Sequence, residues 1–192
     1  MSDFMCPVCL SPVSQPVKEG TQCSVHPTRL LLPTAYVKAH SDDPYLGLIL
    51  SDKYELHKSL GHGGFGSVYY AIQRGQIRQA VAVKLLTRQN AAYLDLFRDE
   101  MRVVAQLRSP YTVRYLDSGV HYGQERAVQE LAYMVMDFLK GETLAHRLIR
   151  SGAIEAKQMI PWTIQLLHSL AEAHELGIIH SCLLYTSPSP RD

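Results

Sequence analysis

Strand-like runs of apolar and polar residues dominate the middle of the chain. They cover residues 54–60, 67–73 and 79–86: the second carries aromatic and β-branched side chains, the third alternates between apolar and polar positions, and all three predict β-strands. A glycine cluster separates the first strand from the second. Residues 112–117 and 132–139 have the same strand character, and a polar stretch from 121 to 130 joins them. We therefore expect a β-sheet built from these segments.

Helical periodicity follows the third strand and returns near the end of the chain. Between residues 90 and 108 the apolar side chains recur at steps of three and four, which gives one stripe made of Leu94, Phe97, Met101, Val104 and Leu107. Ser109-Pro110 ends this helix, because a residue before proline disfavours the α conformation. A short helix is predicted from 141 to about 150, and a longer one from about 155 to 176, with Gly177 behind it. Pro161 kinks that last helix or marks its effective first turn.

The composition is that of a folded, nearly neutral protein. Hydrophobic residues make up 46% of the 192 residues and charged residues 19%, and the formal net charge is +1. This balance gives no sign of a nucleic acid or an anionic membrane as partner. Because the sequence has neither an apolar stretch long enough to span a bilayer nor a signal-peptide pattern, we expect a cytoplasmic protein.

Residues 1–29 contain few large apolar side chains but three cysteines and a histidine in zinc-ribbon spacing. Cys6 and Cys9 form one knuckle, and Cys23 and His26 form a second one. Zinc takes four nitrogen or sulfur ligands in a tetrahedron, and in so small a segment the metal would supply the folding energy. The alternative is redox-active or incidental cysteines, but a redox pair is expected in a βαβ context, which is absent. The sequence leaves the role of this module open between binding a protein partner, positioning the rest of the chain and pairing protomers.

Glycines with phosphate-binding spacing follow the first strand. The run reads Leu60-Gly61-His62-Gly63-Gly64-Phe65-Gly66-Ser67-Val68-Tyr69. A dinucleotide-binding loop of this spacing must open a helix, whereas here a strand follows. A strand–loop–strand hairpin whose backbone amides cover phosphates fits better, and glycine permits the close approach. The alternative is an ordinary glycine-rich turn.

A lysine and a glutamate follow at positions that suit a phosphate site. In Val-Ala-Val-Lys, residues 81–84, strand alternation puts Ala82 and Lys84 on one face, where a small side chain leaves room for a flat base beside a cation. Glu100 falls on or beside the apolar stripe of the helix, where an unpaired carboxylate is costly, and Lys84 is its natural partner. The alternatives are a solvated strand lysine and a glutamate that reaches solvent.

The chain resembles the protein kinase family, and most of all the bacterial eukaryotic-like serine/threonine kinases. The resemblance covers residues 54–180 and rests on the glycine loop, the lysine strand, the helix glutamate, residues 133–139 and residues 175–180, in that order. It implies an α+β fold: a kinase N-lobe with an antiparallel β-sheet and one helix, followed by the first helices of a truncated C-lobe. Ser109-Pro110 departs from the His-Pro that such kinases often have.

The resemblance also implies a site for ATP with Mg2+. Lys84 and Glu100 would orient the phosphates, and the glycine loop would cover them. Met136 would be the gatekeeper, Asp137 and Leu139 would offer hinge backbone groups to adenine, and Leu60, Val68 and Ala82 would sandwich its ring. The implied ATP-binding residues are Leu60, Gly61, His62, Gly63, Gly64, Phe65, Gly66, Val68, Ala82, Lys84, Met136, Asp137 and Leu139.

The kinase pattern stops at His180, which should begin the His-Arg-Asp motif of the catalytic base. Ser181 and Cys182 stand at the next two positions, and the residues that hold Mg2+ in this family do not follow. We interpret residues 181–192 as a non-native tail derived from a DNA-library adapter. The expected layout is therefore a zinc-ribbon-like module at 1–29, a linker at 30–53 and a protein kinase domain at 54–180, truncated before its catalytic loop.

Two functions are consistent with this layout. In the first, the parent protein transfers the γ-phosphate of ATP to serine or threonine of protein substrates, and this chain alone is inactive. In the second, the protein is a non-catalytic pseudokinase or nucleotide-binding scaffold that uses its zinc ribbon for interaction. A catalytic aspartate downstream of His180 in the intact gene would favour the first.

Overall fold

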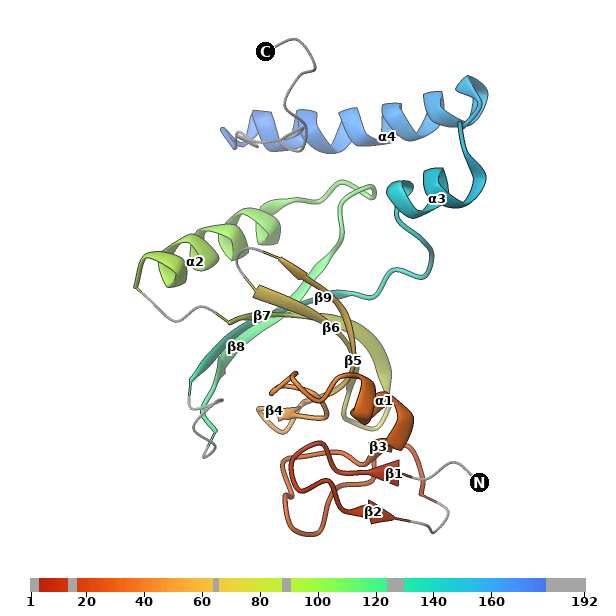
Figure 1. Cartoon of the computed structure of the whole chain (residues 1–192). Coiled ribbons are helices and arrows are strands. Elements are labelled where there is room, and N and C mark those ends of the chain that lie inside the picture. Colours follow the sequence, from red (N-terminus) through yellow and green to blue (C-terminus); the bar gives the residue numbers. More distant parts are fainter. Residues whose placement is uncertain (1–3, 14–16, 64–65, 88–90, 124–129, 179–192) are drawn as a thin grey trace, which may run out of the picture. The chain divides into compact units, whose positions relative to one another are not determined.

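The computed structural model describes residues 4–13, 17–63, 66–87, 91–123 and 130–178. Its main feature is a six-stranded antiparallel sheet in the order β4-β5-β6-β7-β9-β8 (Figure 1). Each of the segments predicted to be a strand is one, although the strand expected from residue 112 begins at Tyr115. The strands are β4 (Ile49–Leu50), β5 (Tyr54–Gly63), β6 (Gly66–Gln73), β7 (Gln79–Leu86), β8 (Tyr115–His121) and β9 (Leu131–Asp137).

One face of this sheet forms the hydrophobic core, and the other carries the candidate site. Val81 and Val83 of β7 are fully buried on one face, whereas Ala82 and Lys84 point to the other, as the alternation predicts. The first face carries the core, because its side chains form one apolar cluster. The cluster consists of Leu48, Leu50, Tyr54, Leu56, Tyr69, Ala71, Val81, Val83, Leu85, Leu131, Tyr133 and Val135. The second face is left for the candidate site.

A smaller sheet forms near the N-terminus. It contains β1 (Phe4–Met5), β2 (Pro12–Val13) and β3 (Leu32–Pro33) in the order β2-β1-β3, and α1 (Thr34–Ala39) follows directly (Figure 1). The helix is fixed by Val37, which is 1% exposed and packs in a cluster with Leu30, Leu32 and Ile49. Apolar packing thus attaches β3 and α1 to β4 at the edge of the main sheet.

The segment 30–53, where we expect a linker, differs from that expectation because it is folded. It contains β3, α1 and β4, and its apolar runs 30–32 and 46–50 are buried. Leu48 and Leu50 belong to the core of the main sheet. The physical reason is that the core face of the sheet must be covered, and these runs cover it although they are too short to show a period.

Buried polar contacts join the N-terminal module to this segment. Arg29 is only 1% exposed, and its guanidinium donates to the carbonyl of Leu46 at 3.1 Å. The carbonyl of Thr28 accepts from the backbone of Ile49 at 2.8 Å. Because a buried cation without hydrogen bonds would be costly, these contacts fix how the module meets the segment.

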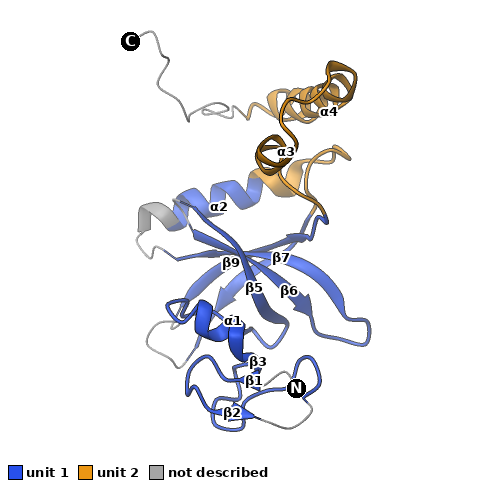
Figure 2. Cartoon of the chain, turned by 45° about the vertical axis from the view of Figure 1, so that its right-hand side comes forward, with its two compact units in different colours: residues 1–102, 115–140 blue, residues 103–114, 141–192 orange. Residues whose placement is uncertain are grey.

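The helix α2 (Ala91–Gln106) occupies most of the range that its apolar stripe predicts. Phe97 is 2% exposed, and Leu94, Met101 and Val104 are half-buried. The chain forms two compact units (Figure 2), of which the first comprises residues 1–102 with 115–140 and therefore includes the main sheet, the module and the first part of α2.

The second unit comprises residues 103–114 and the chain from 141 onward, with α3 (Leu144–Ser151) and α4 (Ala156–Glu175). The Glu172 carboxylate accepts from the backbone N–H groups of Arg108 and Ser109, at 2.6 and 2.8 Å, and so holds the loop that follows α2. Pro161 lies inside α4, and the helix continues through it until Gly177 ends it at φ +72°. Among the described residues, no helix combines the length and the apolar character that a membrane span requires.

Candidate functional site

The glycine-rich segment forms the hairpin between β5 and β6. Gly63 and Gly66 face each other as the last register pair before the turn. A Cβ on Gly66 would lie 1.9 Å from the carbonyl oxygen of Leu85, so this glycine is required by the pairing with β7. A Cβ on Gly61 would meet nothing within 4 Å, and one on Gly63 would come no closer than 3.9 Å. Gly61 and Gly63 therefore leave open space that a ligand can approach, whereas Gly66 is needed for the close pairing of β6 with β7.

A hollow of ≈ 380 Å³ lies under this hairpin. That volume falls in the usual range of small-molecule sites, which is about 300–1,000 Å³. Its lining combines backbone of the glycine loop, two aliphatic side chains and one cation: Leu60, Gly61, His62, Gly63, Gly66, Val68 and Lys84. The hollow can thus hold a flat apolar group together with an anionic one, which is the combination that a nucleotide offers.

Lys84 and Glu100 meet on the site face. The ammonium of Lys84, on β7, donates to a carboxylate oxygen of Glu100, on α2. The Lys84 side chain is 19% exposed and the Glu100 side chain 38%, so solvent contacts the glutamate more than the lysine. An ammonium has three donors, and this contact leaves the others for an anion in the hollow.

Register places the remaining expected residues around the same face. Val68 lies opposite Lys84, and Ala82 lies opposite Met136. Because partners in a pair point to the same side, these four side chains share the site face. Asp137 lies half-buried at the end of β9, and Leu139 is 69% exposed just beyond it. Leu60 lines the hollow, whereas Gly64, Phe65 and His180 lie outside the described residues.

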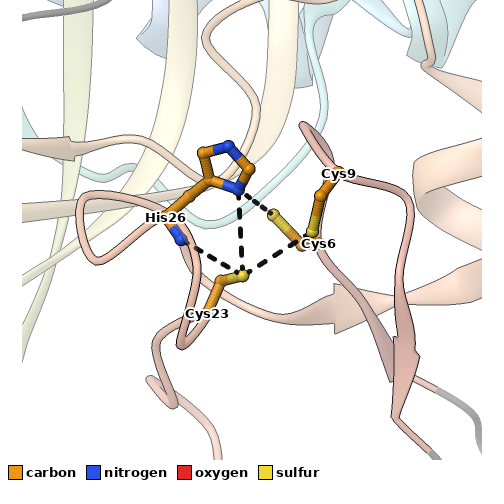
Figure 3. Close-up of side chains that lie close together, drawn as sticks. All are labelled: Cys6, Cys9, Cys23 and His26. Atoms are coloured by element: carbon orange, nitrogen blue, oxygen red, sulfur yellow. Dashed lines mark hydrogen bonds between the residues drawn. The ribbon is translucent and has the colours of Figure 1, made fainter.

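Cys6, Cys9, Cys23 and His26 converge in the N-terminal module (Figure 3). Their ligand atoms all lie within 4.8 Å of one another, with 3.8 Å between the sulfurs of Cys9 and Cys23 and 3.8 Å between Sγ of Cys6 and Nδ1 of His26. Tetrahedral zinc with Zn–S bonds of about 2.3 Å would hold two sulfurs about 3.8 Å apart. The donor set and its spacing thus fit a Cys3His metal centre.

The local environment of each thiol differs. The pKa of Cys9 is lowered to about 6, first by a hydrogen bond from the Ser11 side chain and then by one from its backbone. Burial raises the pKa of Cys6 to about 11. The backbone N–H of His26 also donates to Sγ of Cys23 at 3.4 Å. Because a metal ion binds the thiolate, it would have to displace a more tightly held proton from Cys6 than from Cys9.

The structure adds a buried carboxylate that the sequence pattern hides. Glu55 on β5 is 2% exposed and contacts Arg78 at 2.5 Å, Arg74 at 3.4 Å and His57 at 3.3 Å. His57 in turn lies 3.9 Å from a carboxylate oxygen of Glu19, in the N-terminal module. Since Glu55 stands between two apolar residues of a strand, alternation predicts that it faces solvent. The sequence signal for this site is the two arginines in the turn between β6 and β7.

Comparison with known proteins gives one family. The profile described as "Protein kinase domain" matches residues 54–183, a range that starts where β5 starts. A probable serine/threonine-protein kinase of Clostridium perfringens is 33% identical over 138 residues, which cover 70% of this chain and 19% of that protein. The serine/threonine-protein kinase PknA of Mycobacterium tuberculosis is 30% identical over 140 residues, which cover 71% of this chain and 32% of that protein.

A solved structure matches as well. Rad53, residues 1–466, in complex with AMP-PNP superposes with a TM-score of 0.55 at 26% identity, covering 68% of this chain and 33% of that chain. The chain thus spans about a fifth to a third of the length of these relatives. The matches confirm the predicted α+β kinase-like fold and the predicted resemblance to bacterial serine/threonine kinases.

Proposed function

Because this chain belongs to the protein kinase domain family, we propose that it is the ATP-binding part of a serine/threonine protein kinase. The protein that contains it transfers the γ-phosphate of ATP to serine or threonine side chains of protein substrates. Serine/threonine kinases among the relatives support this reaction class. The observation that carries the proposal is the Lys84–Glu100 pair beside the glycine hairpin.

Each residue of the hollow has a task in this proposal. Lys84 donates to phosphate oxygens, and Glu100 holds its ammonium in place. Gly61 and Gly63 let backbone N–H groups approach the phosphates, while Leu60, Val68 and Ala82 enclose the base. Met136, Asp137 and Leu139 border the base on the β9 side. ATP with Mg2+, when bound, supplies the phosphoryl group and the metal charge that neutralises its oxygens.

A substitution pair tests the nucleotide site. We expect Lys84→Met to weaken the binding of Mg-ATP by about ten- to a hundredfold, because a charge-assisted hydrogen bond is worth about 1.5–3 kcal/mol. Lys58→Met is the matched control, since Lys58 is an exposed strand lysine on β5 outside the hollow. The measurement is calorimetric titration of the chain, with phosphate transfer to a protein substrate followed in the full-length protein. Equal affinity for Lys84→Met and Lys58→Met would refute the assignment.

We also propose that Cys6, Cys9, Cys23 and His26 bind one Zn2+ as a closed structural site. The convergence of three thiols and an imidazole supports this, and so does the small apolar core around them, in which only Cys6, Cys23 and Leu31 are buried. Of the roles that the sequence leaves open, positioning is favoured by the buried contacts of Arg29 and by the Glu19–His57–Glu55 chain. The metal thus stabilises a module that covers the kinase sheet.

Metal analysis tests this centre. After purification without chelator, we expect one equivalent of zinc in the chain and a loss of that metal in Cys23→Ser. Cys182→Ser is the control, because Cys182 is the one cysteine of the sequence that belongs to neither of the two knuckles. Zinc content near zero in the unsubstituted chain, or equal content in both variants, would contradict the proposal.

A further inference from the structure

Strand β5 is an edge strand for most of its length. Within the part of the chain that the structure describes, its outer side is paired only near its start, where Glu55 lies opposite Ile49 and Tyr54 opposite Leu50 of β4. One residue further, the N–H of Leu56 donates to the carbonyl of Leu48 at 2.9 Å, and its carbonyl accepts from Gly47 at 3.1 Å. Beyond that point no strand of the described residues pairs with β5 on that side as it runs toward the glycine hairpin.

Tyr36 of α1 takes the next outer hydrogen bond. The backbone N–H of Ser59 donates to the Tyr36 hydroxyl at 3.0 Å. The register of β5 against β6 shifts on both sides of Ser59, between Leu56 and Lys58 and again between Ser59 and Gly61. Bulged positions bend a strand and leave backbone groups without a ladder partner, so this N–H needs an acceptor from elsewhere.

The contact continues across the hairpin through side chains. Oγ of Ser59 lies 3.2 Å from Nε2 of His62, and Nδ1 of His62 lies 2.8 Å from Oγ of Ser67 on β6. A neutral imidazole donates from one nitrogen and accepts at the other, and hydroxyls do either, so both contacts can be hydrogen bonds at once. Tyr36, Ser59, His62 and Ser67 thus form one chain, which we call the hairpin relay, from α1 to the far side of the glycine loop.

We propose that Tyr36 is a positioning residue for the nucleotide, acting through the hairpin relay. This inference rests on the proposed function, because it concerns the same hollow. A Cβ on Gly61 would meet nothing within 4 Å and one on Gly63 nothing closer than 3.9 Å, so at these two glycines no side-chain packing fixes the height of the strand over the hollow. The relay supplies that fixation immediately before Leu60 and across the strands. In turn, α1 is held by Val37 in the apolar cluster next to the metal module.

The test is Tyr36→Phe, which keeps the ring and removes only the acceptor. Tyr45→Phe is the matched control: Tyr45 is also a half-buried tyrosine of the segment 30–53, and within the described residues its hydroxyl has no hydrogen bond. We expect faster amide hydrogen exchange at Ser59 and at residues 60–63 in Tyr36→Phe, and an affinity for Mg-ATP lower by about three- to tenfold. Tyr45→Phe should leave both quantities as they are.

If the role of Tyr36 were purely structural, Tyr36→Phe would speed exchange throughout β5, β6 and β7 and leave the affinity for Mg-ATP unchanged. That result would overturn the proposal. Unchanged exchange at Ser59 also overturns it. If the unsubstituted chain binds no Mg-ATP, the proposed function fails instead. The double variant Tyr36→Phe/His62→Ala adds a second readout: members of one relay should lose less affinity together than the product of their separate losses. Independent losses would show that the relay does not act as a unit.

Discussion

Leu48→Ala tests whether the segment before the matched kinase domain belongs to the kinase core. Leu48 is fully buried and packs in the cluster of the main sheet. Truncation of a buried leucine costs about 2–5 kcal/mol, depending on how far the cavity collapses. A domain of this size is stable by about 5–15 kcal/mol, so the change removes a large share. Ile77→Ala is the control, because Ile77 is 86% exposed and its loss should change stability by less than about 0.5 kcal/mol.

Native-state amide hydrogen exchange of β7 is the assay, since it reports the opening of the unit that contains Leu48. The chain's one tryptophan, Trp162, lies in the other unit, so its fluorescence would not report that opening. A loss of about 2–5 kcal/mol corresponds to exchange about 30- to 4,000-fold faster at amides that exchange through global opening. Exchange in Leu48→Ala that matches Ile77→Ala would refute the reasoning that 30–53 is part of the core.

Truncation at Tyr54, where the family match begins, extends the same prediction. A chain that starts there loses Leu48 and Leu50, which are fully buried in the core cluster of the main sheet. At about 1.5–3 kcal/mol for each buried side chain, the sheet loses about 3–6 kcal/mol, a large share of the stability of a domain. We therefore expect strongly reduced amide protection in β6 and β7 of this shorter chain. A well-protected sheet would contradict the prediction.

Two further predictions concern the hairpin and the core at high pH. Gly66→Ala should destabilise the sheet by several kcal/mol in a denaturant titration, because its Cβ would lie 1.9 Å from the carbonyl oxygen of Leu85. Gly61→Ala has open space around its Cβ, so it should leave the stability unchanged and weaken the binding of Mg-ATP. Burial and a hydrogen bond to Asp43 raise the pKa of Tyr69 above its ordinary value of about 10, so above that pH the unfolded chain ionises first and stability falls by about 1.4 kcal/mol per pH unit. Tyr69→Phe should show a shallower fall between pH 10 and 11, and an unchanged slope would count against this account.

Local sequence patterns predict the strands and helices whose buried side chains recur with a regular period. The strand β7 is an example, because Val81 and Val83 alternate with Ala82 and Lys84 and the structure separates the two pairs as alternation requires. Helix α2 follows from its apolar stripe for the same reason. Lys84 and Glu100 come together because each lies on a predictable face of its own element. The order of the kinase motifs along the chain then indicates that these two residues pair.

Contacts between irregular segments leave no periodic pattern in the sequence. These contacts form the parts of the fold that the sequence does not predict. Leu48 and Leu50 lie in a run too short to distinguish a linker from a covering strand. Glu55 looks like an outward strand residue until the fold brings Arg78 and Arg74 over it. Tyr36 is one tyrosine among 11, and its hydrogen bond to Ser59 arises only when a bulge turns that amide outward.

The two ends of β5 explain why the loop needs support from outside the sheet. At its start, Tyr54 and Leu56 are locked in the core, while at its end Gly61 and Gly63 must remain open for a ligand. Packing cannot fix the open end, because any side chain that filled the space would exclude the phosphates of the proposed nucleotide. A hydrogen bond from the outer edge fixes the strand and leaves the hollow free. Tyr36 provides that bond at the point where the packed part of the strand gives way to the open part.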